Sequence, residues 1–137
     1  MYIIILATLL TTTQVVQEPT WDKPNDPYTI DYEFNNELGI IKLIITPKKG
    51  YKWEDAYNAR LKLKKNKNAV LTKRTFTNKD KDFVRQENNV VVLIPYYLKR
   101  PKDTVVKGKL NFLICNDKVC KPQKNVELLI HIYMDGC

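Results

Sequence analysis

The residues best suited to chemistry in this chain of 137 residues are its three cysteines, Cys115, Cys120 and Cys137. Cys115 and Cys120 stand between two apolar runs in "LNFLICNDKVCKPQKNVELLI", and the four residues that separate them are typical of a turn. Residues flanking the turn of an antiparallel hairpin have Cα atoms about 4.5–5.5 Å apart, and a disulfide needs about 4.4–6.8 Å. The spacing therefore predicts two sulfurs that can bond and separate with little backbone movement, as reversible thiol–disulfide chemistry requires.

A structural disulfide is the first alternative for this pair. A disulfide stabilises chiefly by restricting the unfolded chain, and its effect grows with loop length to about 3 kcal/mol for a loop of about 15 residues. Because Cys115 and Cys120 enclose a much shorter loop, a purely structural bridge adds little, which favours the redox interpretation. The spacing also differs from the C-x-x-C motif of thioredoxin-like enzymes, which lies at the start of a helix.

A zinc site is the second alternative. Cys115, Cys120, His131 and Cys137 match the ligand count of a Cys3His centre. The C-x4-C spacing is unusual for zinc, however, and His131 lies well along an expected strand. We therefore expect His131 to be an outward-facing strand residue and predict no metal, while Cys137 has no predicted role.

The elements that must position the cysteines are strands, because apolar and polar residues alternate with a period of two along most of the chain. Pro95 and Pro101 indicate an edge strand or a bulge near Tyr96 and Tyr97, and residues 53–61 form the only stretch that tolerates a helix. Strands are expected at 28–34, 38–46, 59–65, 69–77, 89–97, 105–115 and 124–134. The predicted fold is all-β, an immunoglobulin-like antiparallel β-sandwich of about seven strands.

The N-terminal segment differs in character from the rest of the chain. Residues 2–10 are almost wholly apolar and are followed by Thr- and Gln-rich sequence, which is the pattern of a secretory signal. We predict a signal peptide over 1–18 and a single domain over 19–137, with a buried first strand as the alternative for the apolar run. No apolar run approaches the ~20 residues of a transmembrane helix. Because of the signal-like segment, the protein is expected in the periplasm or otherwise exported.

The formal charge of +8 is concentrated in residues 42–81, which hold 13 Lys or Arg and 3 Asp or Glu. In "RLKLKK" Leu alternates with Lys, as in a half-buried strand with a solvated outer face. No phosphate-binding Gly-rich loop or RNA-binding aromatic motif accompanies it, so we predict no nucleic-acid partner and a preference for acidic partners. An alternative function follows from this charge: a non-enzymatic immunoglobulin-like binding module that uses the face around Lys62, Lys64 and Lys73 and keeps a structural disulfide.

The segment "GKLNFLICNDKVCKPQK" resembles the N-terminal periplasmic domain of the DsbD thiol:disulfide interchange protein and the related disulfide bond corrector proteins. That family has two cysteines on a hairpin of an immunoglobulin-like domain, followed by a C-x-P motif that matches Cys120-Lys121-Pro122. The upstream segment "ITPKKGYKWEDAYNARLKL" is similar to a family stretch in which Gly-Tyr precedes further aromatic residues. This chain departs from the pattern at Lys52 and Glu54, where tyrosines are expected.

The resemblance implies a protein-disulfide reductase that needs no organic cofactor and no small-molecule substrate. Cys115 and Cys120 would be its catalytic dithiol, relaying electrons from a membrane thiol-electron carrier to oxidised thioredoxin-like periplasmic proteins. We expect a monomer, with Cys120 reacting first because of its position.

The resemblance also implies residues around the sulfurs. A family cap loop would place Phe83 over the disulfide with Asp82 beside it, and the Gly-Tyr motif would bring Tyr51 near. Phe76 is a second choice for the cap, and ordinary core packing is the alternative for either Phe. In the turn itself, Lys118 would lower a neighbouring thiol pKa and Asp117 would raise it.

Overall fold

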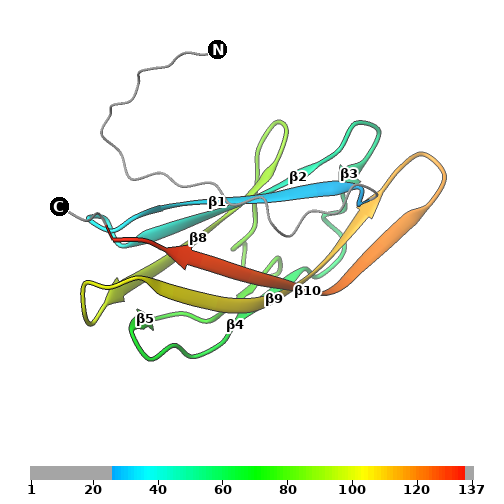
Figure 1. The fold of residues 1–137 in the computed structure, drawn as a ribbon. Coiled ribbons are helices and arrows are strands. Elements are labelled where there is room, and N and C mark those ends of the chain that lie inside the picture. Colours follow the sequence, from blue (N-terminus) through cyan, green and yellow to red (C-terminus); the bar gives the residue numbers. More distant parts are fainter. Residues whose placement is uncertain (1–25, 135–137) are drawn as a thin grey trace, which may run out of the picture.

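Ten antiparallel strands make up the computed structural model, which describes residues 26–134 (Figure 1). The longer strands follow the alternation of the sequence, with every second side chain buried. The strands are β1 (Tyr28–Asn35), β2 (Ile40–Pro47), β3 (Lys52–Trp53), β4 (Arg60–Leu63), β5 (Ala69–Leu71), β6 (Thr75–Thr77), β7 (Val84–Arg85), β8 (Val90–Leu98), β9 (Thr104–Cys115) and β10 (Cys120–Ile132).

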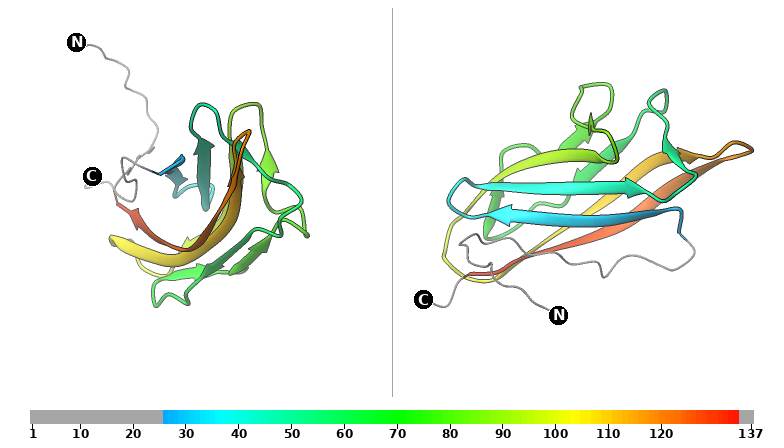
Figure 2. Two further views of the ribbon diagram at one scale, coloured as in Figure 1. Left: turned by 90° about the vertical axis from the view of Figure 1, so that its right-hand side faces the viewer. Right: turned by 90° about the horizontal axis from the view of Figure 1, so that it is seen from above.

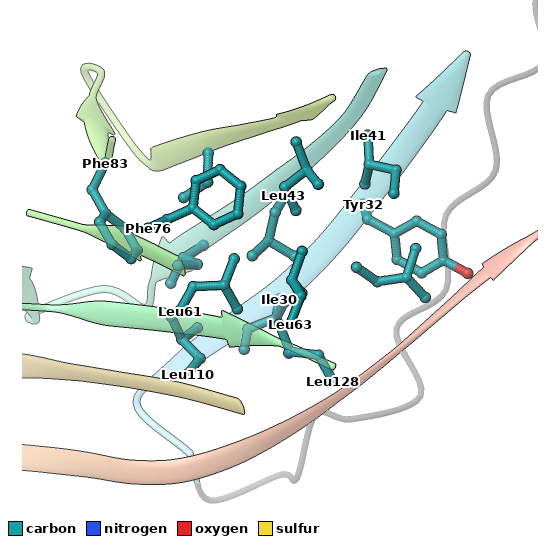
Figure 3. Packing of buried hydrophobic residues seen from close by; sticks show 14 of the residues in the cluster. Ile30, Tyr32, Ile41, Leu43, Leu61, Leu63, Phe76, Phe83, Leu110 and Leu128 are labelled. Atoms are coloured by element: carbon teal, nitrogen blue, oxygen red, sulfur yellow. The ribbon is translucent and has the colours of Figure 1, made fainter. Parts of the chain in front are cut away.

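The strands form two sheets that face each other across one hydrophobic core (Figure 2). One sheet has the order β1-β2-β8-β5 with β7 also on β8, and the other has the order β10-β9-β4-β6 with β3 also on β9. The prediction of an all-β antiparallel sandwich is confirmed. The described residues contain no helix of the length and hydrophobicity needed to cross a bilayer. Side chains from both sheets fill the space between them, among them Ile30, Tyr32, Ile41, Leu43, Leu61, Phe76, Leu110 and Leu128 (Figure 3).

The strand count exceeds the expected seven for local reasons. The expected strand over 69–77 is two strands, since β5 pairs with β8 in one sheet and β6 pairs with β4 in the other. Residues 72–74 between them are exposed, so the chain crosses there from one layer to the other. β3 and β7 contain only two residues each, too few to show a period. Within 53–61, Trp53 belongs to β3 and the chain then turns into β4 without a helix.

Pro95 lies in β8, a strand with neighbours on both sides. On one side β8 pairs with β2, while on the other it pairs with β7 at Val90–Val91 and with β5 only from Tyr96 onwards. Pro95 is opposite Ile40 of β2 but has no partner strand on its other side, where its missing N–H leaves no ladder bond unmade. The sequence signal for an edge applies to this stretch of β8 and not to the whole strand.

The hydroxyl of Tyr32 links the two sheets along one side of the sandwich. It donates to the carbonyl oxygen of His131 at 3.1 Å and accepts from the His131 N–H at 2.8 Å. Tyr32 lies on β1 and His131 on β10, so these bonds join strands at the edges of opposite sheets. They also anchor the C-terminal half of β10, whose other end carries Cys120.

Tyr96 holds the turn between β1 and β2. Its N–H donates to the carbonyl of Gly39 at 2.8 Å, and its hydroxyl donates to the Asn36 side-chain oxygen. Gly39 has a φ of 68°, and a Cβ added there would lie 2.5 Å from the Tyr96 carbonyl oxygen, so only glycine fits this approach. Burial raises the pKa of Tyr96 to about 12.

This pKa predicts a loss of stability in alkali. Between about pH 10 and pH 12 the unfolded chain gives up the phenolic proton and the folded chain keeps it, so stability falls as the pH rises through that window. Tyr96→Phe should remove up to about 1.4 kcal/mol per pH unit from the slope of unfolding free energy against pH. Urea denaturation at a series of pH values measures this slope. Tyr97→Phe, at an exposed position, is the control. Equal slopes in all three proteins would contradict the assignment.

Candidate redox site at the hairpin tip

The hairpin of β9 and β10 extends beyond the rest of the sandwich and carries both cysteines near its tip (Figures 1 and 2). Cys120 stands directly opposite Cys115 in the register, and the two form a disulfide. Their Cα atoms are 4.0 Å apart, closer than the expected 4.5–5.5 Å. The predicted disulfide across a hairpin is therefore present in the structure.

Asn116 closes the turn between the cysteines. Its N–H donates to the Val119 carbonyl at 2.9 Å, and its side-chain oxygen accepts from the N–H groups of Lys118 at 2.8 Å and Val119 at 2.7 Å. Asparagine forms such turns without the glycine that tight hairpins otherwise favour. Asp117 and Lys118 are both exposed at the tip.

The two cysteines project from the outer side of the sheet. Cys115 follows Ile114, which is fully buried, and so points away from the core. Cys115 is half-buried, because β3 covers its other flank, while Cys120 is exposed on the outermost strand. Cys120 is therefore the more accessible of the two cysteines to another protein.

Lys52 is a neighbour of the disulfide that the sequence interpretation counted only as a departure from the family pattern. It stands opposite Cys115 on β3, so Cys115 has Cys120 on one side and Lys52 on the other. Both residues line a hollow of about 250 Å³, together with Asp117 and with the ion-paired side chains of Asp55 and Arg85. A nearby lysine favours the thiolate form of a cysteine. A two-residue strand offers no periodicity from which this pairing could have been predicted.

Tyr51 contacts the hairpin near its tip through Lys121, the residue after Cys120. Its hydroxyl accepts a hydrogen bond from Lys121 Nζ at 3.3 Å, and the same ammonium lies 5.5 Å from the ring centroid. Hydrogen bonds from Lys121 and then Asn116 lower the pKa of Tyr51. Because Lys121 stands opposite Ile114, this contact lies on the side of the hairpin away from the sulfurs.

Phe83 is a core residue in this structure. Its side chain is buried with the other core residues (Figure 3). The ring centroid lies 5.5 Å from that of Trp53. Asp82 next to it accepts from Lys73 Nζ at 2.6 Å and from the Thr77 N–H at 2.9 Å, which closes the loop after β6. Phe76 is buried as well. The contacts are those of the core-packing alternative, and a capping role for either Phe stays a prediction.

The free edge of β10 is irregular beside the disulfide. Asn116 and Val119 face each other across a backbone hydrogen bond, and alternation along the ladder then turns the Pro122 nitrogen away from β9. Pro122 thus removes a donor from the open edge. The register shifts between Gln123 and Val126, where Asn125 has a φ of 53° and donates its N–H to Asn111 Oδ1 at 2.8 Å. The edge next to Cys120 therefore offers little regular backbone for another strand to join.

The zinc alternative and the signal peptide concern residues at the ends of the chain. Cys137 and residues 1–18 lie outside the described residues. Among residues 26–134, no three His, Cys, Asp or Glu side chains gather in a way that could hold a metal ion. The His131 ring stacks on the Tyr133 ring with centroids 6.0 Å apart, and the His131 N–H donates to the Tyr32 hydroxyl.

The chain was compared with protein-family models, with curated proteins and with solved structures. None of the three comparisons found a significant match. The immunoglobulin-like topology and the likeness to the DsbD domain therefore stay predictions from the residues.

Proposed function

We propose that the protein is an exported thiol–disulfide exchange module that passes electrons through Cys115 and Cys120. The observation that carries the proposal is the disulfide at the projecting end of the hairpin, with Cys120 exposed. Its sequence separation of 5 makes it a weak structural bridge, since stabilisation of this kind grows with loop length. Disulfides persist in oxidising compartments, which fits a periplasmic location.

The exchange would proceed in two steps. A thiolate of a reduced partner attacks Sγ of Cys120; the bond between Cys120 and Cys115 breaks, and Cys115 leaves as a thiolate. The partner's second thiolate then attacks its own sulfur in the mixed disulfide and releases Cys120 as a thiolate. The partner ends as a disulfide, the module holds the two electrons as a dithiol, and the new thiolates take protons from water. The reverse sequence transfers the pair to an oxidised thioredoxin-like protein.

Two features of the site support this order of attack. Cys120 is the exposed member of the pair, so an incoming sulfur meets it first. Cys115 stands beside Lys52 across the ladder, and a cation there favours the thiolate that must leave. A better leaving thiolate makes the exchange faster.

The reduction potential tests the proposal. Equilibrated with a dithiothreitol or glutathione series, the pair should lie between about −120 and −270 mV, the range of thioredoxin-like exchange proteins. The oxidised fraction is measured by thiol alkylation and mass spectrometry. A potential below about −300 mV would instead identify a structural disulfide and leave the binding module as the function.

A further inference from the structure

The outer face of β4 and β9 carries a hollow of about 530 Å³ whose lining is strongly basic. Five cationic side chains line it, those of Lys62, Lys64, Lys65, Arg74 and Lys109, and no acidic residue of the described chain does. We call this the basic hollow. Its lining residues come from four separate parts of the sequence.

The basic hollow keeps like charges together. Lys62 stands directly opposite Lys109 in the ladder, and the Lys64 N–H donates to the Lys107 carbonyl at 2.8 Å, so two pairs of lysines adjoin across the same strands. Like charges directly opposite on a sheet are destabilising. Lys109 also stands opposite Glu127 of β10 on its other side, but neither of the two ion pairs between described residues, Lys73–Asp82 and Arg85–Asp55, includes any of these lysines. An anion placed over the hollow would relieve the repulsion.

The basic hollow lies on the same side of β9 as the reactive sulfurs. Lys109, Asn111 and Cys115 alternate with the buried residues of β9 and all project outward. Asn111 and Asn125 line the end of the hollow nearer to the hairpin tip. Figure 1 shows β9 running on from there to the tip. Cys115 lies six positions after Lys109, a span of roughly 20 Å along a strand. One protein partner can cover both places, since a standard interface buries about 800 Å² on each side.

The chemistry of the lining favours an acidic polypeptide over other anions. Single-stranded nucleic acids bind where aromatic rings stack on the bases, and no aromatic side chain among the described residues lines the hollow. A bilayer surface is flat and cannot enter a recess. Lysines, as flexible point charges, suit Asp and Glu side chains without demanding a fixed geometry. We infer that the basic hollow docks an acidic segment of the redox partner and so delivers the partner's thiol to Cys120; this inference rests on the proposed function.

Two thiol peptides test the inference on the intact protein. Each has one cysteine, a Gly/Ser linker of about six residues that can span about 20 Å, and a block of about six Glu or, in the control peptide, Gln. The peptide thiolate attacks Cys120 and releases Cys115, and mass spectrometry follows the mixed disulfide. At about 20 mM NaCl the Glu peptide should react about tenfold faster than the Gln peptide, because docking raises its local concentration. At about 0.5 M NaCl the two rates should converge.

Matched variants locate the effect. Lys62→Gln/Lys109→Gln should lose the advantage of the Glu peptide, whereas Lys42→Gln/Lys79→Gln, which removes the same charge elsewhere, should keep it. Equal rates for the two peptides at low salt, with exchange still occurring, would overturn the docking and leave the proposed function standing. If neither peptide nor dithiothreitol opens the disulfide, the proposed function fails. Displacement of the Glu peptide by anionic vesicles or an oligonucleotide at equal charge concentration would assign the hollow to another class of partner and overturn the inference.

Discussion

The Cys115→Ala variant is expected to accumulate a stable mixed disulfide with a thioredoxin-like protein that lacks its resolving cysteine and carries thionitrobenzoate on the remaining one. The Cys120 thiolate attacks that partner's sulfur, and thionitrobenzoate leaves as a thiolate. The remaining Cys120 thiol is exposed, and without Cys115 nothing within the pair can resolve the adduct. Cys120→Ala should form the adduct about tenfold more slowly, because the half-buried Cys115 is less accessible to a partner and reactivity follows exposure. Both variants should lose dithiol turnover completely. Non-reducing electrophoresis with mass spectrometry measures these outcomes.

Two controls accompany the cysteine variants. The double variant Cys115→Ala/Cys120→Ala should form no adduct through the hairpin, which separates this chemistry from that of Cys137. Each variant should retain most of the wild-type stability, since the short loop makes the disulfide a minor contributor. Adducts that form equally well through either cysteine would contradict the order of attack, and adducts through neither would favour the structural alternative.

Replacing Trp53 by Ala should lower the free energy of unfolding by about 3–5 kcal/mol, the usual cost of removing a buried large aromatic residue. The Trp53 ring is buried between Phe112, with centroids 5.3 Å apart and planes at 10°, and Phe83, with centroids 5.5 Å apart. A domain of this size is typically stable by only about 5–15 kcal/mol, so the loss is a large fraction of the total. Urea denaturation followed by circular dichroism gives the value.

Trp53→Phe is the matched control, because it keeps an aromatic ring between the two phenylalanines. It should recover more than half of the stability that Trp53→Ala loses. The two variants should also differ in the exchange rate of the Cys115–Cys120 disulfide, because Trp53 pairs with Ile114, the residue before Cys115. A loss below about 1 kcal/mol for Trp53→Ala would mean that the ring stack does not hold the two sheets together.

Most of the strands were predictable because each long strand buries one face and so repeats every two residues. The alternation of β1 and β9 and the more continuous apolar runs of β2 and β8 identify these strands at nearly the observed bounds. The disulfide was predictable for a related reason: a short turn between two strands leaves few choices for the residues at its ends. Both inferences depend on neighbours close together in the sequence.

What could not be predicted depends on contacts between distant segments. The crossing of the chain after Leu71 is set by β5 pairing with β8 while β6 pairs with β4. The position of Lys52 beside Cys115 depends on a two-residue pairing across about sixty residues of chain, for which no local pattern exists. Likewise, Phe83 follows a short polar loop without periodicity, so its neighbours in the sequence do not indicate whether its side chain is buried or exposed. The structure brings its ring to Trp53.

Pro122 and the bulge that follows it bear on how long two proteins stay together at this tip. A regular open edge invites a neighbouring chain to lengthen the sheet by successive backbone bonds, and such a contact dissociates slowly. Beside Cys120 that growth stops at once, because one donor is missing and the next residues are out of register. In the proposed exchange, a visiting protein would then be held mainly by side chains and by the transient covalent link between sulfurs, and would depart when that link is resolved. The same irregularity discourages copies of this chain from joining into fibrils through their projecting ends.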